Sequence, residues 1–152
     1  MRVLLILLMC AGPAFGQTAA APAPRGAPAP PLALPAGMSP LPHGAYRLSF
    51  RSGESAVSPA QAQTLAEIGR RLAAIPAGTG RITVEGQASG PSNDVSAARR
   101  VALARAQAVR AALVAGGLDE TRVDVRALGR TPAALDAADV LPPGVQRAGP
   151  TR

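Results

Sequence analysis

Short segments in which apolar and polar residues alternate mark the folded part of the chain. In YRLSF, residues 46–50, every second side chain is apolar, and RITVEG (81–86) and RVDVRALG (122–129) repeat this pattern. A period of two is typical of strands that bury one face. Because the opposite face of each strand is charged, we expect one sheet with helices on one side only, a two-layer α/β sandwich.

Two segments between these strands have helical periodicity. The first opens with a capping box formed by Ser58 and Gln61 around Pro59, and Pro76 ends it. Its apolar residues follow a 3, 4, 3 spacing that keeps one face apolar: Leu65, Ile68, Leu72 and Ile75. The second helix is expected between residues 94 or 96 and a glycine cap at Gly116. The predicted order is β-α-β-α-β, and helical crossovers allow parallel pairing of the flanking strands with right-handed connections.

The second helix carries a charged residue beside its apolar stripe. At about 100° per residue, Arg105 lies within roughly 60° of Val101 and Val109. A half-buried guanidinium needs a partner to offset its lost hydration. Two interpretations are open at this point: Arg105 contacts a ligand, or it pairs internally, for example with Glu85 or Asp94.

The N-terminal residues have a different pattern. Residues 1–16 combine the positive charge of Arg2, a short apolar run and a small-x-small motif before Gln17, which predicts a secretory signal peptide. The run is shorter than the ~20 residues of a spanning helix and Pro13 interrupts it, so we expect no transmembrane helix in the mature chain. Lipidation at Cys10 and a retained N-terminal anchor stay open as alternatives.

Proline divides the rest of the chain. Residues 17–43 contain eight prolines and no hydrophobic period, which indicates a Pro/Ala-rich linker; at about 3.1 Å per residue it could extend on the order of 80 Å. We expect the folded domain at 44–141 and a disordered tail at 142–152. The last strand, at 138–141, is predicted to be a short edge strand because two prolines follow it.

Composition excludes several functions. The formal charge is +7, but all basic residues are Arg, and two Phe, one Tyr and no Trp leave little for bases to stack upon, so we expect no nucleic-acid partner. If Cys10 leaves with the signal peptide, the mature chain has no cysteine, and the only histidine, His43, lies in the linker, so no metal site, cofactor or catalytic residue is expected. A carboxylate pair of Glu85 and Asp94 is the remaining enzymatic alternative.

The motifs resemble those of a known family. ITVEGQASG (82–90) and ARRVALARAQAVRAALVAGGLDETRVDVRALG (98–129) are similar to the OmpA-like peptidoglycan-binding domain. The signature of that family is a strand that ends in a Gly-x-Thr-Asp turn and a helix with Arg-Ala-x-x-Val. The resemblance extends from about residue 46 to 129 and is strongest at Arg105, Ala106 and Val109.

This resemblance implies a function. The family holds the outer parts of a bacterial envelope to the cell wall without catalysis, by binding the stem peptide at diaminopimelate. Its turn aspartate binds the ammonium group and its helix arginine binds the carboxylate, to which a guanidinium can donate two parallel hydrogen bonds. Arg105 matches that arginine. The resemblance therefore implies an exported protein of the periplasm, associated with peptidoglycan or the outer membrane, with envelope proteins as further partners.

The turn departs from the family pattern. Ala88 and Ser89 stand where the family has Thr-Asp, so the acid that neutralises the ammonium is absent there. Ser89 can supply a hydrogen bond, and Asp94 is the nearest acid that could compensate. Three outcomes are open: wall binding with Asp94 as the substitute, altered or weak wall binding, or a retained fold that acts as a periplasmic protein-interaction module.

Overall fold

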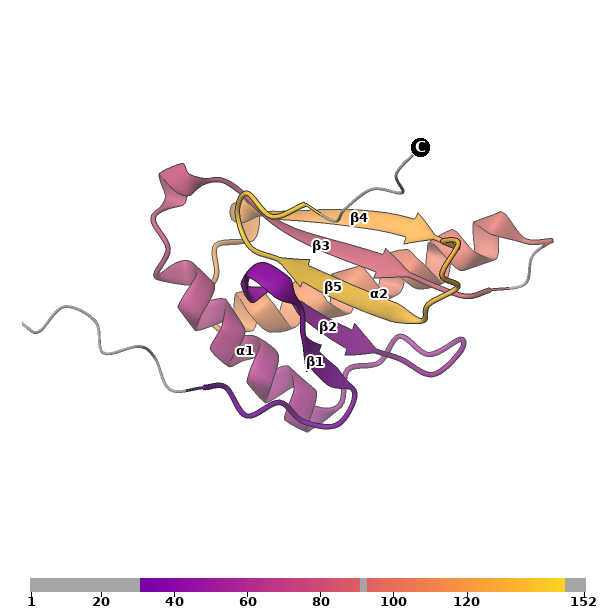
Figure 1. The fold of residues 1–152 in the computed structure, drawn as a ribbon, viewed down its shortest axis with the longest axis horizontal. Helices are drawn as coiled ribbons and strands as arrows, with labels where there is room; N and C mark the ends of the chain where they lie inside the picture. The colour runs from indigo at the N-terminus through magenta and orange to yellow at the C-terminus, as the bar shows by residue number, and fades with distance from the viewer. Residues whose placement is uncertain (1–30, 91–92, 147–152) are drawn as a thin grey trace, which may run out of the picture. The chain divides into compact units, whose positions relative to one another are not determined.

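The fold is known from a computed structural model, which describes residues 31–90 and 93–146. All of the elements described here lie in one compact unit that begins at Leu32. Figure 1 shows its strands and its two long helices, which are β1 (Met38–Pro40), β2 (Tyr46–Ser49), α1 (Pro59–Ala73), β3 (Ile82–Gln87), α2 (Val95–Ala115), β4 (Val123–Gly129) and β5 (Ala137–Leu141). The predicted signal peptide, residues 17–30 of the predicted linker and residues 147–152 lie outside the described residues.

Both helices start at the capping residues that the sequence indicates. Ser58 Oγ accepts a hydrogen bond from the Gln61 N–H at 3.4 Å, and Gln61 Oε1 accepts one from the Ser58 N–H at 3.0 Å, which confirms the capping box. At the start of α2, Asp94 Oδ1 accepts a hydrogen bond from the Ala97 N–H at 2.7 Å. The left-handed residue after α2 is Gly117, with φ of 97°, one position later than predicted.

The sheet has the strand order β1-β2-β5-β3-β4. Strands β3 and β4 pair in parallel as predicted, but β5 lies between β2 and β3 and is antiparallel to both. The prediction of an edge strand at 138–141 is therefore wrong. The two prolines follow Leu141 and thus leave the ladder intact, while all five residues of β5 are buried.

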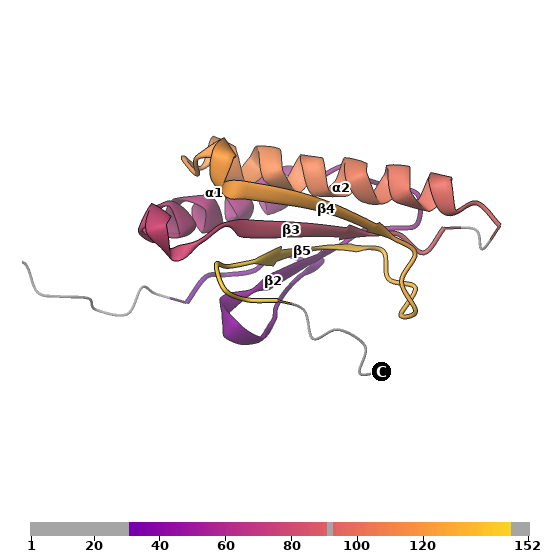
Figure 2. The same ribbon diagram turned by 90° about the horizontal axis from the view of Figure 1, so that it is seen from above.

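Both helices cover the same face of the sheet, as Figure 2 shows from above, which confirms the two-layer α/β sandwich. The core between the layers includes Leu48, Leu65, Ile68, Ile82, Val84, Val109, Leu113 and Val140. Close approach of α2 to β3 requires a glycine, because a Cβ built on Gly86 would lie 1.9 Å from the Ala102 carbonyl oxygen. The helix backbone therefore rests almost directly on the end of β3.

The opposite face of the sheet carries paired charges. Arg47 on β2 donates two hydrogen bonds to Asp139 on β5, at 2.7 and 2.8 Å, although Asp139 is almost fully buried. Glu85 on β3 pairs with Arg126 on β4 at 3.5 Å. The prediction of one apolar and one charged face is confirmed.

The folded unit begins earlier in the chain than residue 44. Strand β1 lies inside the segment predicted as a linker and pairs with β2, with Met38 opposite Leu48. Leu32 and Leu34 pack against the core as well. A three-residue strand that contains a proline has no readable period, so the sequence pattern could not distinguish it from linker. None of the helices in the described part of the chain is both long and apolar enough to span a membrane.

Candidate functional site

Arg105 is the bulkiest fully buried side chain among the described residues. It projects from the middle of α2 between Ala102 and Ala106, neither of which has exposed surface. The sequence predicted a position at the edge of the buried stripe, whereas the structure places Arg105 inside it. Small neighbours on the helix leave room for the long side chain to run beneath the loops at this end of the sheet.

The guanidinium of Arg105 is bonded within the protein. One acceptor is the carboxylate of Asp136, which forms a salt bridge with Arg105, and the side chain of Arg105 has no exposed surface. The aromatic ring of Phe50 lies 5.0 Å from the Arg105 Cζ atom. The hydrogen-bond acceptors are the carbonyl oxygens of Arg51 at 2.9 Å, Glu54 at 2.7 Å and Gln87 at 2.7 Å, and Asp136 Oδ1 at 2.7 Å. Arg105 therefore ties together the β2–α1 loop, the end of β3 and the residue before β5.

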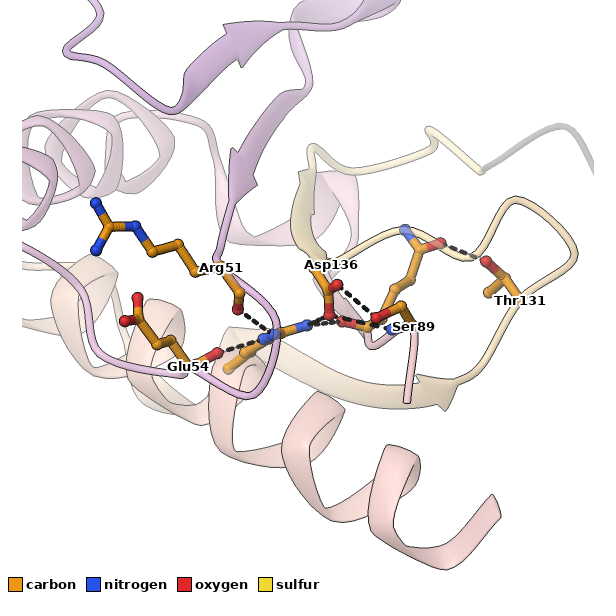
Figure 3. A network of polar contacts seen from close by, with 7 residues as sticks. Arg51, Glu54, Ser89, Thr131 and Asp136 are labelled. Carbon is orange, nitrogen blue, oxygen red and sulfur yellow. Dashed lines mark hydrogen bonds and ion pairs between the residues drawn. The ribbon is translucent and has the colours of Figure 1, made fainter. Parts of the chain in front are cut away.

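Asp136 links the buried arginine to the turn after β3 (Figure 3). Its Oδ1 atom accepts the Ser89 N–H at 3.1 Å, and its Oδ2 atom accepts the Ser89 hydroxyl at 2.6 Å. Burial acts to raise the pKa of Asp136, but the hydrogen bonds from Ser89 and Arg105 outweigh it and hold the pKa below its ordinary value. Asp136 is therefore ionised at neutral pH, while 18% of its side chain is still exposed.

A small cavity of about 120 Å³ lies beside this carboxylate. It is formed where the start of α2, the turn after β3 and the β2–α1 loop meet. Among the described residues that line it, Asp136 is the only charged one. The lining consists of Ser52, Gly53, Ala88, Gly90, Ala97, Ala98, Val101 and Asp136. Mostly small side chains thus leave a recess that has a single ionised group on its wall.

The structure brings two of the three predicted site residues together. Ser89 and Arg105 meet through Asp136, which both of them contact. Asp94 is exposed and engaged in capping α2, next to Ala97 on the cavity wall but outside the lining. Internal pairing of Arg105, one of the two open interpretations, is present. Its partner, however, is neither Glu85 nor Asp94.

Sequence reasoning missed Asp136. The residue lies 47 positions after Ser89 and 31 after Arg105, in a loop that has no motif. A signal was available: this acid lies two positions before the last predicted strand, and a strand placed centrally would have brought its start to the end of β3. Because that strand was predicted at the edge of the sheet, the contact of Asp136 with Arg105 and Ser89 was not predicted.

The enzymatic alternative gains no support from the geometry. Glu85 lies on the charged face of the sheet and pairs with Arg126, whereas Asp94 caps a helix on the opposite face. Within residues 31–90 and 93–146, no group of three or more His, Cys, Asp or Glu side chains could hold a metal ion. What the described residues offer is a recess with one carboxylate on its wall, which a buried arginine holds in place.

The fold and the site define a small α/β sandwich domain with a cavity at one end of its sheet. The OmpA family model matches residues 49–139, more than half of the chain and all of the residues that form the Arg105 network. The chain belongs to the OmpA family. Among curated proteins, no sequence match was found.

Solved structures share this fold at low sequence identity. The periplasmic domain of MotB is 15% identical with a TM-score of 0.53, over 63% of this chain and 60% of that domain. The peptidoglycan-associated lipoprotein of Burkholderia pseudomallei is 18% identical with a TM-score of 0.53, over 62% of this chain and 87% of that protein. The OmpA-like domain of FopA1 from Francisella tularensis is 14% identical with a TM-score of 0.50, over 71% of this chain and 75% of that domain.

Proposed function

We propose that this domain binds peptidoglycan without catalysis, at the diaminopimelate of the stem peptide, and tethers the cell envelope to the wall. Membership in the OmpA family supports this ligand, as does the name of the Burkholderia pseudomallei neighbour. The observation that carries the proposal is the cavity beside the Arg105–Asp136 pair. A small recess with the Asp136 carboxylate on its wall and the buried charge of Arg105 behind it fits a small group that bears both charges.

The proposed binding residues are Arg105, Ser89 and Asp94, together with Asp136. Ser89 positions the carboxylate of Asp136 at the cavity wall. Arg105 is fully buried, so it acts through its charge and by holding the loops that form the cavity. Asp94 begins α2 next to the lining residue Ala97 and is the proposed outermost contact.

The proposed location is the periplasm, in association with peptidoglycan or the outer membrane. The signal-peptide pattern of residues 1–16 supports export, and MotB contributes a periplasmic domain of the same fold. A proline-rich segment before the domain suits a tether between the wall and an anchor. Further envelope proteins are proposed partners, and no cofactor or nucleic acid is required.

The test fills the cavity without touching a charged residue. Ala97→Leu places a larger side chain on the cavity wall, and Ala111→Leu makes the same change at an exposed position of α2. Purified domain is mixed with isolated peptidoglycan sacculi and pelleted. We expect wild type and Ala111→Leu to co-sediment and Ala97→Leu to stay in solution, and free diaminopimelate to release the bound protein.

Two results would contradict this proposal. Equal sedimentation of Ala97→Leu and Ala111→Leu would remove the cavity as the binding site. Failure of the folded wild type to pellet would overturn wall binding itself. Arg105→Ala is a poor probe for this purpose, because removal of a buried partner leaves Asp136 uncompensated and destabilises the fold.

A second candidate function is a periplasmic protein-interaction module without wall binding. It is favoured by the turn, where Ala88 and Ser89 replace the family's Thr-Asp, and by the four internal acceptors of Arg105. A folded domain that does not bind sacculi but co-purifies with a defined envelope protein would support this function. Release of soluble sugar or peptide fragments from sacculi would instead indicate an enzyme.

A further inference from the structure

The carboxylate of Asp136 has remaining capacity to accept a hydrogen bond. Two carboxylate oxygens offer about four lone-pair sites, and the bonds from Arg105 and Ser89 use three of them. Because Asp136 is partly exposed and lines the cavity, the remaining site is accessible to a ligand there. The other described lining side chains are small, apolar or uncharged, so Asp136 is the one ionised acceptor among the residues that line the cavity.

We propose that Asp136 is the acceptor for the ammonium group of the ligand, and that this acid reaches the site from the β4–β5 loop in place of an acid in the turn after β3. The inference rests on the proposed function, since it concerns the same cavity. Ser89 occupies the turn position and directs both of its polar groups at Asp136. The turn thus orients a carboxylate that belongs to another segment.

The neighbouring charge determines which ammonium compounds bind. Arg105 and Asp136 together are neutral, so a simple diamine gains little from the pair as a whole. A zwitterionic end, with its ammonium near Asp136 and its carboxylate on the side of Arg105, complements the charges of both members without touching the buried arginine. Arg105 has no exposed surface and is a positioning residue, which orients Asp136 and favours its ionised form. The inferred ligand class is an amino acid end with a free ammonium and a free carboxylate.

The test moves the acid between the two segments. Asp136→Asn keeps the shape and removes the charge, Ser89→Asp adds an acid to the turn, and the double variant exchanges the two positions. Asp124→Asn is the matched control, because it removes one exposed acid from β4 on the charged face. Affinity for sacculi is measured by pelleting, with free diaminopimelate and the diamine cadaverine as competitors.

We expect Asp136→Asn to bind about tenfold more weakly, since a hydrogen bond to a charged group is lost, and Asp124→Asn to bind as wild type does. The Ser89→Asp/Asp136→Asn variant should regain most of the affinity. Diaminopimelate should compete at least tenfold better than cadaverine. Binding of Asp136→Asn that equals wild type would overturn this inference and leave the proposed function standing, whereas failure of wild type to bind would overturn both.

A measurement on the unaltered protein covers the case in which Asp136→Asn fails to fold. The carboxyl ¹³C signal of Asp136 is followed by NMR while diaminopimelate is added to wild type. We expect this signal to shift with saturation while that of Asp124 stays constant. An Asp136 signal that does not move while other cavity signals do would show that the ligand binds without this carboxylate, and the inference would be wrong.

Discussion

At the scale of the residue, one buried arginine organises the candidate site. Arg105 is held by three backbone carbonyls and one carboxylate, which come from segments far apart in the sequence. A buried charge is tolerated only when it is paired and hydrogen-bonded. The arginine signature of the family therefore has a structural role here: it fixes the loops that form the cavity wall.

The ionisation of Asp136 predicts a dependence of stability on pH. Its pKa is lowered in the folded protein, so its contribution to stability is present above the unfolded pKa of about 3.9 and is lost as pH falls through the folded value. We expect the gap in unfolding free energy between wild type and Asp136→Asn to be constant above about pH 5 and to shrink below pH 4.

Urea unfolding of both proteins across this pH range measures that gap. Other acids with lowered pKa values, such as Glu67 and Asp124, are present in both proteins and cancel in the difference. A gap that stays constant down to pH 2 would mean that folding does not lower the pKa of Asp136.

At the scale of the element, the position of β5 and the close contact of α2 with β3 define the site. Strand β5 lies between β2 and β3 and runs antiparallel to β3, so the start of β5 lies beside the end of β3. Asp136, the residue before β5, therefore reaches the end of β3. Gly86 lets the α2 backbone approach β3 near Arg105. Both features bring the arginine and the turn within hydrogen-bond distance of the same carboxylate.

The glycine contact predicts a specific loss of stability. A methyl group on Gly86 would lie 1.9 Å from the Ala102 carbonyl oxygen, so α2 must move away from the sheet. We expect Gly86→Ala to destabilise the fold by about 1–3 kcal/mol and to weaken sacculus binding. Gly78→Ala is the control, because no atom lies within 4 Å of a Cβ at Gly78. Equal urea midpoints for the two variants would contradict the proposed close contact.

At the scale of the whole molecule, the folded unit includes residues that composition assigns to the linker. Strand β1 extends the sheet beside β2, and Leu32, Leu34 and Met38 add apolar contacts to the core. Gln61 in the first turn of α1 also donates a hydrogen bond to the Ala36 carbonyl oxygen at 3.0 Å. The segment before residue 44 is thus fastened to both layers of the sandwich.

Truncation tests this boundary. We expect a fragment of residues 44–146 to be less stable than a fragment of residues 31–146 by on the order of 2–4 kcal/mol, because it loses a strand and the burial of several apolar side chains. The longer fragment should match the chain from residue 17 onward. Urea unfolding followed by circular dichroism measures the difference, and equal stability of the two fragments would show that the domain begins at residue 44.

The sequence by itself determined the local elements and the family. Period-two alternation, the Ser58 capping box and the apolar stripe of the first helix depend on neighbouring residues, and each appears in the structure where it was predicted. Only the tertiary structure decided that β5 is central and that Asp136, 31 residues after Arg105, is the acid that pairs with this arginine. Both outcomes depend on which segments pair although they are far apart in the sequence. The free energy of that pairing arises from packing and charge compensation between distant residues, which a local sequence pattern does not contain.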